Sequence, residues 1–244
     1  MKKFILILAV CFSAVGVFAQ SAAQFKNEGN AALKSKDYKT ALAKYEQFLA
    51  AEDTVDDFAL VFNAGYCARK IKDYAKAEQL FAQSVKNNYK ASSSYLYLAT
   101  VQKSQKKYTD MVGTLDAGIK ACPTKKSKMV SMLAKHYLLE GQKAQKANKF
   151  EDAEGLYQKA GNVKSKLQAD ALLSLGNLYY NKGAKIMQAA TPVANTEPEK
   201  YKAESVKAKS YFKKSLTELT KAKVIAPARE DISTTMATVK GLLK

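Results

Sequence analysis

Few side chains in this sequence have the chemistry of a catalytic or metal-binding site. The chain has one histidine, His136, which stands between Lys135 and Tyr137 with no metal or triad pattern around it. Cys67 and Cys122 lack a Cys-x-x-Cys spacing and a convincing partner base, and the sequence contains no glycine-rich phosphate loop. We therefore expect no enzymatic activity, no bound metal and no cofactor.

Lysine dominates the charged side chains. The 244 residues contain 40 Lys and Arg against 22 Asp and Glu, which gives a formal net charge of +18, and only Arg69 and Arg229 are arginines. Lysine is a hydrated point charge that suits diffuse attraction better than the bidentate reading of phosphates or bases. We expect no nucleic-acid binding. Weak attraction to an anionic envelope surface stays open beside the simpler interpretation, a solubilising lysine surface.

The start of the chain, residues 1–19, has the pattern of a secretory signal peptide. Two lysines precede an apolar run that ends in small residues before Gln20. The run is short for a membrane span, and Cys11 does not fit a lipoprotein site because Val10 is large and the apolar run continues beyond the cysteine. We expect cleavage after Ala19 and export to the bacterial periplasm or beyond, with no transmembrane anchor in the mature chain.

A pattern of small and aromatic residues recurs through the rest of the chain. Gly29, Gly65 and Gly141 each lie in a helical pattern and are each followed nine residues later by an aromatic residue. Ala99 takes the place of the glycine in a further copy, and Gly176 marks a fifth. A glycine inside a helix costs about 1 kcal/mol relative to alanine, so its recurrence in phase needs a packing reason.

This pattern resembles the tetratricopeptide repeat (TPR), a helix–turn–helix unit of 34 residues with small residues at positions 8, 20 and 27. The resemblance implies an all-α fold, a TPR-type α-solenoid of about five helical hairpins with a C-terminal capping helix, after the N-terminal signal peptide. Small residues would let the two helices of a hairpin approach closely, and aromatic residues would fill the space between hairpins.

The units differ in regularity along the chain. We expect three TPR units over residues 20–125, with starts near residues 22, 58 and 92. Residues 126–244 should form two extended hairpins, with starts near 134 and 169, followed by the capping helix 228–243. Cys67 and Cys122 fall in different units, so we expect two buried, unpaired cysteines although an oxidising compartment permits a disulfide.

The resemblance also implies a binding surface, because the first helices of TPR units line a concave face. Amides there would bind a peptide backbone, cations would bind acidic groups, and aromatic rings would supply apolar area. The alternative is a solvated helix face with incidental tyrosines and lysines. The predicted groove residues are Lys26, Asn30, Lys34, Phe62, Asn63, Tyr66, Lys70, Tyr97, Thr100, Asn177 and Tyr180.

Three of these residues match part of a more specific site. Some TPR domains grip the C-terminal carboxylate of chaperone tails, and Lys26, Asn30 and Asn63 match the first three positions of that clamp. Ser93 and Tyr97 stand where the clamp has cations, so its cationic half is missing. Ordinary TPR asparagines are the simpler interpretation.

The sequence thus favours a non-enzymatic protein–protein interaction scaffold of the bacterial cell envelope, which binds a partner peptide or protein in the concave TPR groove. One alternative is a lysine-rich adaptor for anionic envelope polymers or lipids. Another is a structural subunit of an envelope complex. The sequence does not identify the partner.

Overall fold

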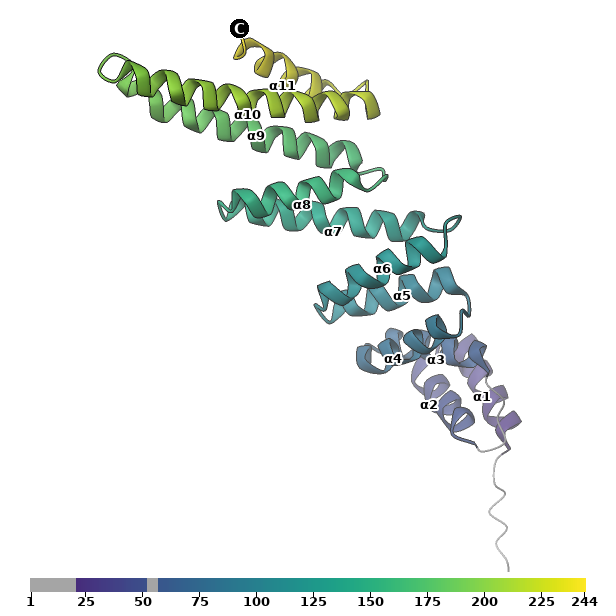
Figure 1. Cartoon of the computed structure of the whole chain (residues 1–244). Helices are drawn as coiled ribbons and strands as arrows, with labels where there is room; N and C mark the ends of the chain where they lie inside the picture. The colour runs from purple at the N-terminus through teal and green to yellow at the C-terminus, as the bar shows by residue number, and fades with distance from the viewer. Residues whose placement is uncertain (1–20, 52–56) are drawn as a thin grey trace, which may run out of the picture. The chain divides into compact units, whose positions relative to one another are not determined.

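The computed structural model describes residues 21–51 and 57–244, and the predicted signal peptide lies outside them. The described residues form α-helices and one short 3₁₀ helix, with no strand among them (Figure 1). The chain divides into two compact units between Tyr89 and Lys90. The expected all-α fold of consecutive helical hairpins is confirmed. The grouping of the repeats into residues 20–125 and 126–244 stays a prediction.

The first unit holds two hairpins and the second holds the rest. The helices of the first unit are α1 (Ala22–Lys34), α2 (Tyr38–Leu49), α3 (Phe58–Lys70) and α4 (Tyr74–Lys86). The second unit contains α5 (Ala91–Ser104), α6 (Tyr108–Ala121), α7 (Ser127–Lys146), α8 (Phe150–Asn162), α9 (Gln168–Ala190), η1 (Thr191–Val193), α10 (Pro198–Ile225) and α11 (Glu230–Gly241).

The recurring Lys-Asp-Tyr motif builds the turn of the first two hairpins. Lys36 and Lys72 have φ values of 65° and 66°, the left-handed conformation that reverses the chain after a helix. The next residue, Asp37 or Asp73, caps the second helix, because its side chain accepts a hydrogen bond from a backbone N–H three residues on. The motif is therefore a helix stop followed by a helix start.

The glycines of the repeat lie where two helices of a hairpin approach each other. A Cβ atom built on Gly141 would stand 2.7 Å from the ring of Tyr157, and one on Gly29 would stand 2.7 Å from the ring of Tyr45. Gly65 is also close to its neighbours, with Phe81 at 3.2 Å. Each glycine thus makes room for a large side chain of the second helix, which is the packing reason that the sequence required.

Adding a methyl group should therefore change the stability of the α7–α8 hairpin in opposite directions at two glycines. We expect Gly141→Ala to lower the free energy of unfolding by about 1–3 kcal/mol, because the Tyr157 ring must move. Gly155→Ala should raise it by about 0.5–1 kcal/mol, because nothing in the described structure lies within 4 Å of the added atom. Thermal and denaturant unfolding of both variants measures this. Equal effects would mean that the helices do not meet at Gly141.

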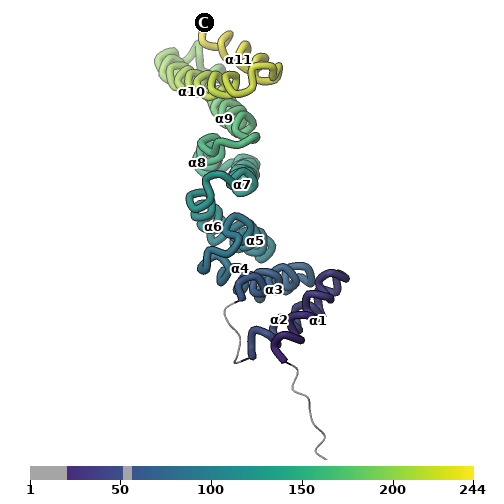
Figure 2. The backbone as a smooth tube through the Cα atoms, turned by 90° about the vertical axis from the view of Figure 1, so that its right-hand side faces the viewer, coloured from purple at the N-terminus to yellow at the C-terminus, as the bar shows by residue number. Residues whose placement is uncertain are grey.

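The last helix, α11, packs on the α9–α10 hairpin at the C-terminal end of the chain (Figure 2) and covers an apolar face of it. On α11, Ile232 is buried with Leu172 and Ala222, and Val239 is buried against the cluster that contains Phe212. A helical stack needs such a cover for its final apolar surface. Helix α11, which begins directly after Arg229, also supplies polar side chains to the groove that is described below.

The two cysteines of the described residues are free, as expected. Cys67 is buried in α3, and burial raises the pKa of its thiol to about 11. A thiol with such a pKa carries little thiolate at neutral pH, so Cys67 is a packing residue of α3. Cys122 is half-buried, whereas the sequence predicted that it would be buried.

Candidate partner-binding groove

A groove of about 510 Å³ lies in the second unit between α7, α9 and α11, with Tyr157 of α8 at its base. Its lining consists of amides, hydroxyls and two phenols, and none of the ten described residues that form it is charged. They are Gln142, Gln145, Tyr157, Ser174, Asn177, Tyr180, Asn181, Thr234, Thr235 and Thr238. The uncharged lining offers no ion-pair partner to a charged ligand, so the groove suits neutral polar groups.

Helical periodicity brings the four carboxamides of the groove together. Gln142 and Gln145 are three residues apart on α7, and Asn177 and Asn181 are four residues apart on α9, so each pair shares one helix face. Each carboxamide offers two N–H donors and one carbonyl acceptor. Two neighbouring helices therefore present a surface of amides with which a polypeptide backbone can exchange hydrogen bonds.

A buried phenol fixes one of these amides. Tyr157 is almost fully buried beside Gly141, and its hydroxyl donates a 2.7 Å hydrogen bond to Oε1 of Gln145. Burial raises the pKa of Tyr157, so the phenol keeps its proton at neutral pH and stays a donor. Because Oε1 of Gln145 already accepts the hydrogen bond from Tyr157, its NH₂ group is the part of the amide that can donate hydrogen bonds to a ligand.

The α11 side of the groove offers oxygen acceptors. The hydroxyl of Thr235 donates to the carbonyl of Asp231 at 2.9 Å, and that of Thr238 donates to the carbonyl of Thr234 at 3.1 Å. Opposite them on α9, Ser174 donates to its own helix in the same way. A hydroxyl that donates to its own helix keeps its oxygen lone pairs as acceptors. The groove thus combines amide donors with hydroxyl acceptors.

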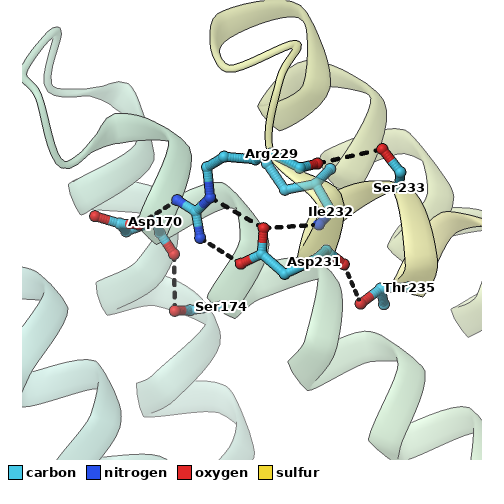
Figure 3. A network of polar contacts seen from close by, with 7 residues as sticks. All are labelled: Asp170, Ser174, Arg229, Asp231, Ile232, Ser233 and Thr235. Carbon is cyan, nitrogen blue, oxygen red and sulfur yellow. Dashed lines mark hydrogen bonds and ion pairs between the residues drawn. The ribbon is translucent and has the colours of Figure 1, made fainter.

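An arginine holds the start of α11 to α9, as Figure 3 shows. The guanidinium of Arg229 forms ion pairs with Asp170 at the start of α9 and with Asp231 in the first turn of α11. The hydrogen bond from Arg229 lowers the pKa of Asp231. Arg229 thereby positions the threonines of α11 along the groove, and a lysine could not bind both carboxylates with the same fork geometry.

In the first unit, two predicted groove residues lie on either side of a buried phenol. Tyr45 donates a 2.9 Å hydrogen bond to Oδ1 of Asn30, and the side chain of Asn63 hydrogen-bonds to the same phenol. Burial raises the pKa of Tyr45 to about 12. The structure therefore brings Asn30 of α1 and Asn63 of α3 together, and both amides take part in holding Tyr45 of α2.

Lys26 is engaged within the first unit. Its ammonium lies 2.8 Å from Oδ2 of Asp57, whose other oxygen accepts the backbone N–H of Leu60 and so caps α3. The same ammonium lies 5.8 Å from the ring centroid of Phe48. Lys26 thus links α1 to the start of α3. This ion pair with Asp57 gives a structural reason for a lysine at the position that matches the carboxylate clamp. Lys34, the last residue of α1, is exposed.

Phe62 corrects the predicted groove, because it lies in the core of the first unit. Its side chain is only 8% exposed, and its ring packs edge-on against Phe81 at 5.7 Å and Tyr89 at 5.8 Å. The turn that follows α4 brings Tyr89 over this position, which a repeat register alone does not reveal. Phe62 is therefore a packing residue.

Tyr66 and Lys70 form a cation–aromatic cluster at the end of α3. Tyr66 meets Tyr38 edge-on at 6.0 Å, and the ammonium of Lys70 lies 5.4 Å from the ring of Tyr66 and 5.6 Å from that of Tyr38. Arg69 also lies over Tyr66. The cluster joins α3 to the first turn of α2, so these side chains are held by one another.

The remaining predicted residues divide between the groove and another helix. Asn177 and Tyr180 line the groove, whereas Tyr97 and Thr100 are half-buried on α5 and do not line it. The hydroxyl of Thr100 donates to the carbonyl of Leu96 at 2.7 Å. The predicted groove residues thus belong to separate local arrangements in the two units.

Sequence reasoning missed most of the groove lining. Gln142, Gln145, Ser174 and Asn181 stand at repeat positions 9, 12, 6 and 13, and the same register that selected Asn177 would have found them. The threonines of α11 lie outside the repeats and carry no such signal.

The structure places the single histidine in a packed setting. His136 stacks on Tyr108 at 5.4 Å, and burial lowers its pKa, so the imidazole is neutral at pH 7. Within residues 21–51 and 57–244, no group of three or more His, Cys, Asp or Glu side chains could hold a metal ion. None of the helices that the structure describes has the length and hydropathy of a membrane span.

Comparison with known proteins assigns the family. A family profile for the tetratricopeptide repeat matches residues 26–94. A solved TPR repeats protein from Bacteroides fragilis is 38% identical, with a TM-score of 0.85 over 91% of this chain and 99% of that chain. The chain belongs to the tetratricopeptide repeat family. TPR proteins are in general non-catalytic scaffolds that bind protein or peptide partners, and the fold of this TPR protein supports a protein–protein interaction scaffold in general.

Two more distant TPR structures are also similar to this TPR protein. The MamA protein is 16% identical, with a TM-score of 0.43 over 85% of this chain and 96% of that chain. YrrB, described as a TPR protein with an unusual peptide-binding site, is 16% identical, with a TM-score of 0.42 over 88% of this chain and 91% of that chain.

Proposed function

We propose that this TPR protein is a non-enzymatic scaffold that binds an extended segment of a partner protein in the groove between α7, α9 and α11. The observation that carries the proposal is the groove lining itself, ten residues of amide, hydroxyl and phenol character without a charge. A partner segment can therefore be bound through its backbone, and no charged group of the partner needs to be desolvated there.

The chemistry of the lining matches an extended backbone. Such a backbone presents C=O and N–H groups in alternation, and the groove offers amide donors on α7 and α9 and hydroxyl acceptors on α9 and α11. Tyr180 adds a ring that is already held against Phe212 at 6.2 Å, so its contact area costs little conformational entropy. Binding of this kind favours an extended segment over a folded surface.

Recovery of a partner from a cell-envelope extract tests the proposal. The immobilised native chain and the double variant Asn177→Ala/Asn181→Ala are compared, with Lys209→Gln/Lys213→Gln as a control on the exposed side of α10. We expect mass spectrometry to find a protein that the native chain and the lysine control retain and the asparagine variant loses. Equal recovery by all three chains would reject the groove as the binding site.

We also propose that the protein works in the bacterial envelope after export. The support is the sequence pattern of residues 1–19, with its lysine start, apolar run and small-residue end. We expect the mature chain to begin at Gln20, as intact-mass analysis of exported protein would show. A chain that keeps Met1, or one that carries a lipid on Cys11, would contradict this proposal.

The charge of α10 supports a second candidate function, the binding of an anionic envelope polymer or lipid. This helix contains eight lysines and three glutamates, and its exposed ammonium groups suit diffuse attraction. Such binding would weaken steeply as salt screens the charges, whereas backbone binding in an uncharged groove would change little. Salt dependence therefore separates the two functions.

A further inference from the structure

The groove lies next to a second cavity that has a different chemistry. This cavity, of about 370 Å³, lies between the α7–α8 turn and the part of α9 that runs past that turn. It shares Gln145 and Asn181 with the groove, so the two cavities are adjacent. Lys182 and Lys185 line it, and none of its nine described lining residues is acidic.

The cationic cavity exists because α9 is longer than the first helices of the regular repeats. The helix has 23 residues, whereas α1 and α3 have 13 each, and the additional turns carry Lys182 and Lys185 past the turn at Asn148. Gly183 lies against the ring of Phe212, which fixes how α9 is rotated on α10. The extension is thus a firmly packed element that places two ammonium groups at the end of an uncharged groove.

The first of these lysines is held in place before any ligand arrives. The ammonium of Lys182 lies 4.9 Å from the ring centroid of Phe150, the first residue of α8, and the side chain is half-buried. A cation held on an aromatic face loses less conformational entropy on binding than a free lysine does. Lys182 and Lys185 also border a further cavity, whose other charged lining residues are Lys200 and Glu204.

We propose that the partner segment carries a run of acidic side chains directly beside the part that lies in the uncharged groove, and that Lys182 and Lys185 bind these carboxylates. The inference rests on the proposed function of the groove and adds the composition and direction of its ligand. Two ammonium groups three residues apart on α9 favour aspartate and glutamate side chains within the segment over a single terminal carboxylate.

Selection from a random peptide library displayed on phage, with the native chain as bait, tests this inference. We expect the enriched peptides to carry Asp or Glu clustered at one end. Synthetic versions in which Asn or Gln replaces these acids should bind about tenfold more weakly, as two partly exposed ion pairs allow, and this preference should fade in high salt.

Variants assign the preference to its residues. Lys182→Gln/Lys185→Gln should bind acidic and neutral peptides equally, whereas Lys209→Gln/Lys213→Gln, which removes the same charge from exposed positions outside the cavity, should keep the preference. Amidation of the peptide C-terminus should change nothing. A loss of binding on amidation would show that the lysines bind the terminal carboxylate of the peptide and not its acidic side chains, and it would overturn the inference.

The outcomes separate this inference from the function on which it rests. Failure to enrich any peptide, or enrichment that Asn177→Ala/Asn181→Ala leaves unchanged, would reject the groove as a peptide site and the inference with it. Peptides that need the asparagines but show no acidic preference would overturn only the inference. A preference for acidic peptides that survives Lys182→Gln/Lys185→Gln would also overturn only the inference.

Discussion

Replacement of Ile232 by alanine should lower the stability of α11 by about 2–4 kcal/mol and release this helix while the hairpins before it stay folded. Ile232 has no exposed surface and packs against Leu172 and Ala222, so the shorter side chain leaves a cavity under the helix. In a stack of hairpins each repeat contacts only its neighbours, so the damage stays local. Hydrogen exchange of the α11 amides measures the loss directly.

A matched substitution gives the control for Ile232→Ala. Val224 is 78% exposed on the neighbouring α10, so Val224→Ala should change stability by less than about 0.5 kcal/mol. If both variants exchanged α11 amides at the native rate, α11 would not be docked through Ile232. Ile232→Ala should also weaken partner binding, because the released helix carries three threonines of the groove.

The double variant Asn177→Ala/Asn181→Ala should weaken partner binding by about 2 kcal/mol, a factor of about thirty in affinity. Each alanine removes two amide donors and one acceptor, so backbone groups of the bound segment lose their hydrogen bonds while they remain shielded from water. Both positions face the groove, and Asn181 is exposed, so the fold should tolerate the change. Unfolding curves of the free variant check this tolerance.

The repeat architecture could be predicted from the sequence because each device that builds it is local. These devices lie within a single hairpin, as the first one shows. They are a lysine in the left-handed conformation (Lys36), an aspartate that caps the second helix (Asp37) and a glycine that lies against a large ring (Gly29). Local patterns of this kind survive in a single sequence. The expected exposure of Phe62 was wrong because its burial depends on a contact with Tyr89, which comes from the turn after α4 and not from the local repeat pattern.

The site was predictable only in part, because it combines repeat and non-repeat elements. Asn177 and Tyr180 follow from the register, and Gln142 and Gln145 would have followed from applying the same register to α7. The contribution of α11 depends on how a terminal helix docks through Arg229 and Ile232, which no repeat position encodes. The cationic cavity likewise depends on the length by which α9 exceeds the first helices of the regular repeats.

The affinity of the native chain and two variants for an enriched peptide, measured by calorimetry at low and high salt, tests the central claim most directly. The account predicts that Asn177→Ala/Asn181→Ala loses most of the affinity at both salt concentrations, while Lys209→Gln/Lys213→Gln binds as the native chain does. The contrary result is that the lysine variant loses binding, the asparagine variant keeps it, and high salt abolishes binding in every chain. The uncharged groove would then not be the binding site, and binding would depend on the lysines of α10.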